Sequence, residues 1–350
     1  MTAELTKTGF LPPKKVSPWR NIGAAVAYFL FYLVVQYLSS AVYYLYLALS
    51  APDGLDYMET SYWIEAQFNE NSNLLMIVLD LILLASMVVW FLLRRRPVMA
   101  SLGLKKPRML ALPLALVAGI GMSCLLNYVM MFIQYLFPEV MESYGESMEA
   151  TYNMTDFALY ALAGVIGAPL IEELFFRQLT TGRLARALPR AVAILLSSAV
   201  FGLVHQHPVQ MVYAGVLGFV MACVYFAYDS IWVSILFHMG FNAVSLLSFI
   251  DVSGLSEAEL YSLDQLLGNL YMTFTVLGIA TLILLFLLRT HTVFCKPRDA
   301  ELPVELAEPD LIPGVAPAGE GYFTEPKAAE MPSAEPADKP HATDGTEAQS

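Results

Sequence analysis

The sequence predicts an all-α protein, a polytopic bundle of about eight transmembrane helices with both termini in the cytoplasm and a disordered acidic tail. Three observations support this. Of the 350 residues, 57% are hydrophobic and 14% are charged, and the mean hydropathy is +0.58. Apolar runs recur that are long enough for the ~30 Å hydrocarbon layer. Basic and acidic connections alternate between these runs. This composition excludes an ordinary soluble enzyme, and a net charge of −12 excludes a nucleic-acid partner.

The apolar runs define the expected spans. In chain order they cover 22–50, 73–93, 110–136, 157–176, 191–206, 209–228, 231–250 and 266–288. Each reaches or approaches the length of about 20 residues that a membrane-crossing helix needs, although the fifth is short and polar residues interrupt the fourth. The first run is far longer than the 7–15 apolar residues of a signal peptide, so we expect it to be retained as a helix.

Charges in the connections give the expected orientation. Lys and Arg precede the first span, lie between spans two and three and between spans four and five, and follow the eighth span. The connections after spans one, three and seven contain Asp and Glu but no Lys or Arg. Because cytoplasmic connections carry the excess of basic residues, this alternation predicts eight spans with both termini in the cytoplasm.

The acidity is concentrated in the C-terminal tail. Residues 297–350 hold twelve acidic and three basic residues, together with many Pro and Ala. Such a segment cannot bury enough apolar surface to offset its ordering entropy, so we expect disorder. The predicted organisation is a cytoplasmic N-terminus (1–20), spans one to three (21–150), a core of spans four to seven (151–252), a loop with the last span (253–296) and the tail (297–350).

Two adjacent glutamates lie in the fourth span. Glu172 and Glu173 point about 100° apart on a helix, so they cannot share one role. Glu173 and Arg177 are four residues apart and can pair. Glu172 is left without a local cation, and an unpaired carboxylate can accept a proton as a general base does. Pro169 removes a helix hydrogen bond just upstream. The alternative is that these charges only mark the cytoplasmic end of the span.

Two later spans carry histidines. Phe201 and His205 lie one turn apart at the end of the fifth span, and His238 and Asn242 lie one turn apart in the seventh. An imidazole and an amide supply proton transfer and hydrogen-bond donation. The alternatives are a structural histidine at a helix end and a polar contact between helices.

Other intramembrane polar residues and small residues receive no catalytic role. Asp80 could line a cavity or pair with a distant base, and Asn127 is expected to bond a neighbouring helix. Ala214, Gly218 and Ala222 form a small-residue stripe that favours close helix packing. The three cysteines are too few and too scattered for a disulfide framework or a thiolate metal site.

The three polar segments are more specific together than apart. Glu-Glu-x-x-x-Arg, Phe-x-x-x-His and His-x-x-x-Asn follow one another in apolar spans about 30 residues apart. This order resembles the CPBP family of intramembrane proteases, also called the Abi or type II CAAX prenyl endopeptidase family. The resemblance covers roughly residues 157–250. The first three spans, the last span and the tail hold no motif that matches.

The resemblance implies a membrane-embedded endopeptidase in which Glu172 activates water with His205 beside it. His238 and Asn242 would stabilise the oxyanion, which needs donors aimed at the developing charge. Glu173 and Arg177 would hold the site together. We therefore expect Glu172, His205, His238 and Asn242 to converge on one water-accessible cavity.

Metal dependence and substrate stay open at this point. The favoured mechanism needs no cofactor, but Glu172, His205 and His238 could instead bind zinc with an open water position. The His-Glu-x-x-His signature of common zinc peptidases is absent from the sequence. The expected partners are membrane lipid and a peptide or protein substrate, lipid-modified if it follows the family's eukaryotic class. The expected location is the plasma membrane if the source is bacterial. Alternatives are a non-catalytic immunity or adaptor protein of the same fold and an ion-coupled transporter.

Overall fold

The computed structural model describes residues 17–95, 98–104, 109–153, 156–205 and 207–288. The regular secondary structure in these ranges is helical, which confirms the all-α prediction. Seven helices in them are long and apolar enough to cross a membrane: Pro18–Ser50, Ser72–Leu93, Ala111–Leu136, Phe157–Ala187, Pro208–Tyr228, Ile231–Phe249 and Glu257–Leu287. The predicted disordered tail lies outside the described residues, as do Arg96, Lys105, Lys106 and Arg108 of the basic connection.

The expected fifth span is shorter than predicted. It forms α10, Arg190–Leu203, a helix of 14 residues that is about 21 Å long and cannot cross a ~30 Å hydrocarbon layer alone. The helix ends in a tight turn, in which the His205 backbone N–H bonds the Gly202 carbonyl. Pro208 then begins α11 (Pro208–Tyr228), and proline disfavours helical backbone in the preceding residue. The prediction of about eight spans with a short fifth thus corresponds to seven long apolar helices and this shorter one in the described ranges.

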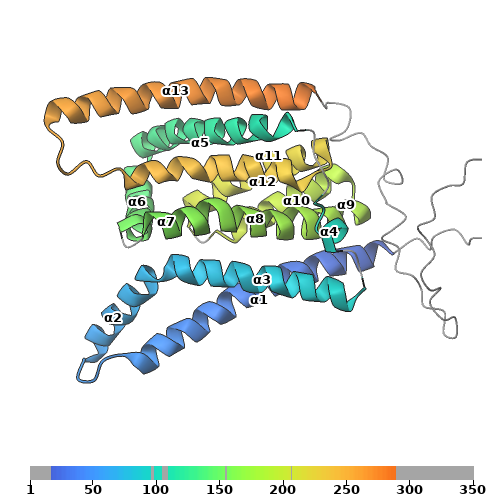
Figure 1. The fold of residues 1–350 in the computed structure, drawn as a ribbon, viewed down its shortest axis with the longest axis horizontal. Coiled ribbons are helices and arrows are strands. Elements are labelled where there is room, and N and C mark those ends of the chain that lie inside the picture. The colour runs from blue at the N-terminus through green and yellow to red at the C-terminus, as the bar shows by residue number, and fades with distance from the viewer. Residues whose placement is uncertain (1–16, 96–97, 105–108, 154–155, 206, 289–350) are drawn as a thin grey trace, which may run out of the picture. The chain divides into compact units, whose positions relative to one another are not determined.

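The helices lie beside one another in the order described next (Figure 1). At one side α13 (Glu257–Leu287) lies along α5 (Ala111–Leu136), and α5 lies along α12 (Ile231–Ala243). Next comes the long helix that carries the two glutamates, followed by α1 (Pro18–Ser50) and α3 (Ser72–Leu93). The long helix is therefore covered on both sides.

Glycines allow the close approach of α5 to its two neighbours. A Cβ at Gly119 would lie 1.9 Å from the Phe237 carbonyl oxygen of α12. A Cβ at Gly121 would lie 2.3 Å from the Phe274 carbonyl oxygen of α13. Because only hydrogen fits in these places, α5 makes backbone contact with both helices, as small residues permit in membrane bundles.

The long helix Phe157–Ala187 contains two π-helical segments. It begins as α7 (Phe157–Tyr160), widens into the π-helical segment η1 (Ala161–Gly167), continues as α8 (Ala168–Glu173), widens again in η2 (Leu174–Thr181) and ends as α9 (Gly182–Ala187). In η1 the Ala168 N–H bonds the Ala163 carbonyl, five residues back. Pro169 has no N–H to offer Gly164 in this register. The two π segments thus flank the residues 168–173 that present both glutamates.

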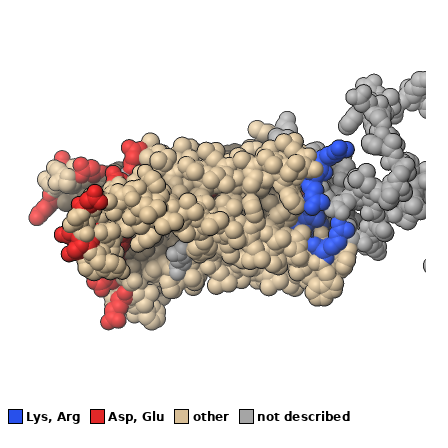
Figure 2. Space-filling model, turned by 90° about the horizontal axis from the view of Figure 1, so that it is seen from below, with Lys and Arg blue, Asp and Glu red and all other residues tan. Residues whose placement is uncertain are grey.

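Short helices occupy the two ends of the bundle. α2 (Tyr57–Glu70) and α6 (Pro138–Asn153) lie at the end where α13 begins, and α4 (Val98–Ser101) lies near α9 at the other end (Figure 1). Figure 2 shows Asp and Glu gathered at one end of the visible face and Lys and Arg at the other, with an uncharged surface between them. This separation agrees with the alternation of connection charges, and the assignment of the basic end to the cytoplasm stays a prediction.

Candidate active site

Glu173 is the most completely bonded carboxylate of the site. Its side chain is fully buried, and its Oε2 lies 3.0 Å from Arg177 Nε, which confirms the expected pairing four residues apart. The Ser234 hydroxyl of α12 donates to the same oxygen, and His238 Nδ1 lies 3.3 Å from Oε1. Glu173 therefore ties α8 to α12 and neutralises the adjacent guanidinium.

Arg177 is buried against an aromatic ring. Its guanidinium carbon lies 4.6 Å from the centre of the Phe201 ring on α10, and its side chain has no exposed surface. Its terminal nitrogens Nη1 and Nη2 make no hydrogen bond with a described residue. A cation over an aromatic face gains about 2 kcal/mol when both groups are desolvated. The ion pair and the ring thus accommodate a charge that would otherwise be expensive to bury.

Glu172 has a different environment from its neighbour. Its side chain is 18% exposed, compared with 0% for Glu173. His238 Nε2 lies 3.9 Å from Glu172 Oε2, beyond hydrogen-bonding distance. The two glutamates thus occupy separate environments, as the helix geometry predicts.

His238 lies between the two carboxyl groups. Its Nδ1 faces Glu173, a carboxylate that accepts a hydrogen bond, so Nδ1 carries hydrogen. Its Nε2 faces Glu172. A carboxylate bonded to one imidazole nitrogen fixes the orientation of the ring and leaves the other nitrogen for chemistry.

His205 joins the site through Phe201. Its Nδ1 lies 2.8 Å from the Phe201 carbonyl oxygen, which can only accept, so Nδ1 is the donor. In a neutral ring Nε2 is then the basic nitrogen. The Phe201 ring contacts the His205 ring at 5.1 Å and the His238 ring at 5.9 Å between centroids. Phe201 thus contacts both histidine rings.

Asn242 has a structural partner. Its Nδ2 donates to the Gly164 carbonyl at 2.8 Å. This is the carbonyl that Pro169 leaves without a donor in the π-helical register. Asn242 therefore replaces a missing backbone hydrogen bond and joins α12 to η1. Only one of its two amide hydrogens is used in this contact.

Comparison with known proteins agrees with this geometry. Residues 154–244 match the family model described as type II CAAX prenyl endopeptidase Rce1-like. This segment is therefore similar to that family. The chain is also 28% identical over 133 residues to the protein named "Putative membrane peptidase YdiL" of Bacillus subtilis (strain 168). That match covers 37% of this chain and 54% of the relative, so the chain aligns with about half the length of this curated protein. No solved structure gives a significant match.

The Rce1-like segment contains all six residues predicted for the site. Glu172, Glu173, Arg177 and His238 form one connected cluster in the structure, His205 reaches it through Phe201, and Asn242 is bonded one turn further along α12. The arrangement confirms the pairing of Glu173 with Arg177. The catalytic roles of the residues stay predictions.

Ser234 belongs to the cluster, although the sequence motifs above do not include it. It precedes His238 by four residues, as His238 precedes Asn242, so the three share one stripe of α12. Another expectation is wrong. Asn127 donates to the Ser123 carbonyl of its own helix rather than to a neighbouring helix, because an amide side chain can reach back one turn.

The candidate zinc ligands in the described structure do not surround one point, as the ligands of a metal site do. No group of three or more His, Cys, Asp or Glu side chains in the described ranges is arranged to hold a metal ion. His238 and Glu172 approach each other, whereas His205 Nδ1 is bonded to the Phe201 carbonyl.

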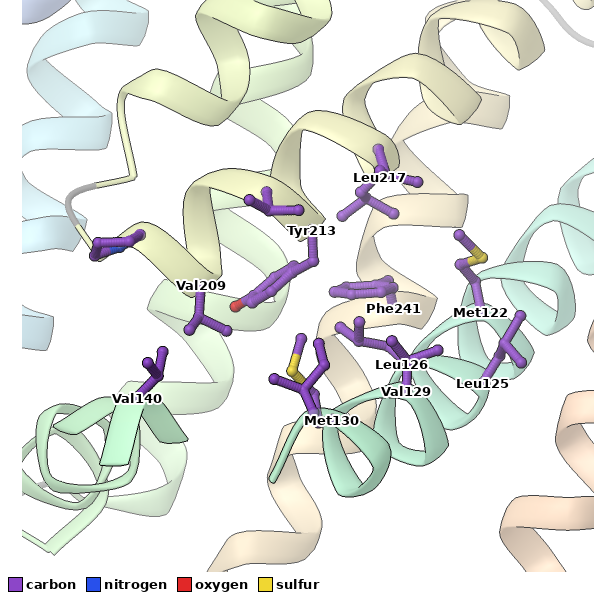
Figure 3. A pocket seen from close by; sticks show the side chains of 14 residues that line it. Met122, Leu125, Leu126, Val129, Met130, Val140, Val209, Tyr213, Leu217 and Phe241 are labelled. Carbon is purple, nitrogen blue, oxygen red and sulfur yellow. The ribbon is translucent and has the colours of Figure 1, made fainter. Parts of the chain in front are cut away.

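A pocket of about 410 Å³ opens beside the Rce1-like site, between α5, α6, α11 and α12 (Figure 3). Its lining is almost entirely apolar and comes from Met, Leu, Val, Ile, Tyr, Pro and Phe side chains, among them Phe241, the residue before Asn242. None of the six candidate site residues lines it. This pocket is therefore not the water-accessible cavity expected from the sequence, and its surface suits an apolar chain.

Proposed function

We propose that the protein is an intramembrane endopeptidase that hydrolyses a peptide bond of a membrane-associated or lipid-modified substrate. The observation that carries this proposal is the difference between Glu172 and Glu173. Glu173 is occupied by Arg177, Ser234 and His238, whereas Glu172 makes no hydrogen bond with a described residue and stays partly exposed. A free carboxylate beside an oriented imidazole is what activation of water requires.

The proposed reaction uses Glu172 as the general base. Its carboxylate takes a proton from water as the water oxygen attacks the carbonyl carbon of the scissile bond. The proton then passes to the amide nitrogen as the C–N bond breaks, which returns Glu172 to its ionised form. In the proposal His205, with basic Nε2, assists by accepting a hydrogen bond from the same water.

The developing oxyanion needs donors that are already in place. In the proposal these are Nε2–H of His238 in its imidazolium form, which carries hydrogen on both ring nitrogens, and the second amide hydrogen of Asn242. Glu173 holds the His238 ring through Nδ1, and the Gly164 carbonyl holds the Asn242 amide. Both donors are thereby oriented before substrate arrives, and removal of one such donor typically costs about 10²- to 10³-fold in rate.

The surroundings of the site support a substrate that enters from the membrane. The cluster lies in a bundle with seven candidate membrane spans, and the apolar pocket between α5, α6, α11 and α12 would accommodate a hydrophobic segment or a lipid chain of the substrate. We infer a multi-pass membrane protein, located in the plasma membrane if its source is bacterial, with the basic end of the bundle in the cytoplasm.

The test compares variants in a native membrane extract. Membranes from cells that lack the protein receive purified wild type, Glu172→Gln or the surface control Glu146→Gln, and new peptide N-termini are counted over time by mass spectrometry. Glu146 is exposed on α6. We expect wild type and the control to produce the same new termini and Glu172→Gln to lose at least about 10²-fold in rate, the scale of general-base catalysis. Unchanged cleavage by Glu172→Gln would overturn the proposal.

A further inference from the structure

A buried hydroxyl of α12 lies beside the candidate site, outside its sequence motifs. Ser234 has no exposed surface, and its chain neighbours Val233 and Ile235 are apolar and equally buried. Burying a hydroxyl among apolar side chains costs free energy unless the hydroxyl is hydrogen-bonded. The Ser234 hydroxyl donates to Glu173 Oε2 of α8. Its single hydrogen is therefore directed at a residue of the site.

A buried serine in a helix commonly bonds a carbonyl of its own helix. Ser197 of α10, which also has no exposed surface, does so by donating to the Ile194 carbonyl at 3.0 Å. Ser234 instead reaches another helix. The Met221 carbonyl of α11 lies 3.4 Å from its hydroxyl, but a hydroxyl has one hydrogen and a carboxylate is the stronger acceptor. Ser234 thus joins α12 to α8 through Glu173.

Ser234 and His238 contact the two oxygens of one carboxylate. They lie one turn apart on α12, and Ser234 donates to Oε2 of Glu173 while His238 Nδ1 lies 3.3 Å from Oε1. Arg177 Nε also lies 3.0 Å from Oε2, in an ion pair without hydrogen-bond geometry. The last torsion of a glutamate side chain is only weakly restricted. The ion pair therefore holds the charge, whereas the two contacts from α12 define the plane of the carboxylate.

We propose that Ser234 is a positioning residue for His238. Its hydrogen bond turns the Glu173 carboxylate so that Oε1 faces His238 Nδ1. The bond at one imidazole nitrogen sets the direction of the other, so Nε2 is aimed at the substrate. Ser234 itself is sealed inside the bundle and acts only through Glu173. This inference rests on the proposed function, in which His238 stabilises the oxyanion.

The kinetic test compares two buried serines. Ser234→Ala removes the donor to Glu173, and Ser197→Ala is the matched control, because its hydroxyl is equally buried and bonds its own helix. Alanine favours the helix at both positions, so both variants should fold. The substrate is a synthetic peptide that spans one site cleaved by wild type in the membrane extract.

The expected result is a loss in kcat without a loss in binding. Ser234→Ala should lower kcat about 10- to 100-fold, the range of a hydrogen bond to a charged group, and leave KM within about twofold of wild type. A misdirected donor weakens the transition state more than the bound substrate. Ser197→Ala should keep the wild-type kcat. Equal kcat values for the two alanine variants would overturn the inference.

A second measurement needs no substrate. In protein labelled with ¹⁵N in histidine, the Nδ1–H resonance of His238 is assigned by its loss in His238→Gln. Its exchange with solvent hydrogen reports how firmly Glu173 holds it. We expect exchange at least about tenfold faster in Ser234→Ala than in wild type, and unchanged exchange in Ser197→Ala. Equal exchange rates in the two alanine variants would refute the positioning role.

The proposed function and this inference fail separately. Unchanged cleavage by Glu172→Gln refutes the peptidase mechanism, and the exchange measurement on His238 still tests what Ser234 does to the ring. An inactive Glu172→Gln together with a Ser234→Ala variant of wild-type kcat and wild-type exchange refutes only the role of Ser234.

Discussion

The buried pair of Glu173 and Arg177 makes a prediction about stability that can be worked out from the structure. Both side chains have no exposed surface, and Arg177 Nε lies 3.0 Å from Glu173 Oε2. Glu173→Gln removes the negative charge and leaves the guanidinium buried, with its terminal nitrogens already lacking hydrogen-bond partners among the described residues. Breaking a buried ion pair from one side costs about 3–5 kcal/mol, because the remaining charge is uncompensated.

The same reasoning predicts a partial rescue. In Glu173→Gln/Arg177→Met both charges are gone, and the methionine side chain can fill the space against Phe201. Replacing both members of a buried pair by well-packed hydrophobic groups of similar volume is often neutral or stabilising by about 1–4 kcal/mol relative to the intact pair. The double variant should therefore be more stable than Glu173→Gln alone, a non-additivity expected for residues in direct contact.

The assay is thermal unfolding of the purified protein in detergent, followed by fluorescence or by retention of the folded peak in size-exclusion chromatography. A loss of 3–5 kcal/mol corresponds to a fall of roughly 6–20 °C for a domain of this size class. Arg177→Met alone is the complementary single variant. A melting temperature of Glu173→Gln within about 1 °C of wild type, or a double variant as unstable as the sum of both single variants, would refute the reasoning.

Three further predictions concern the bundle, the π segment and the cofactor. Gly121→Ala, whose Cβ would lie 2.3 Å from the Phe274 carbonyl oxygen, should cost about 1–3 kcal/mol in stability. The control Gly268→Ala, in open space on α13, should be neutral or stabilising by up to about 1 kcal/mol. Equal melting temperatures of the two variants would contradict the close packing of α5 and α13. Asn242→Leu leaves the Gly164 carbonyl without its donor, so the melting temperature should fall as expected for a loss of about 1–3 kcal/mol, and an unchanged value would show that this hydrogen bond is dispensable. Cleavage in the membrane extract should persist after treatment with a zinc chelator, because the proposed mechanism uses Glu172 and water, and loss of activity that added zinc restores would contradict that mechanism.

The amino-acid sequence by itself determined the helical architecture and the local pairings. Length and apolarity identified the membrane-crossing segments, because a helix must satisfy its own backbone hydrogen bonds in lipid. The spacing of four residues between Glu173 and Arg177 predicted their ion pair, since residues one turn apart face each other on a helix. The range 191–206 predicted for the fifth span extends past α10, which ends at Leu203, and between that residue and Pro208 only Val204 is apolar.

Tertiary structure alone decided which helices meet the two glutamates, and at what depth. The contacts of Ser234 and His238 with Glu173, and of Asn242 with the Gly164 carbonyl, depend on the rotation of α12 about its axis. Hydropathy does not encode that rotation, because apolar residues surround the helix on all sides. The approach of Asp80 to Gly167 depends in addition on where α3 crosses η1. The physical reason is that pairings within a helix follow from its fixed geometry, whereas pairings between helices follow from packing, which small residues such as Gly119 and Gly121 permit without specifying the partner.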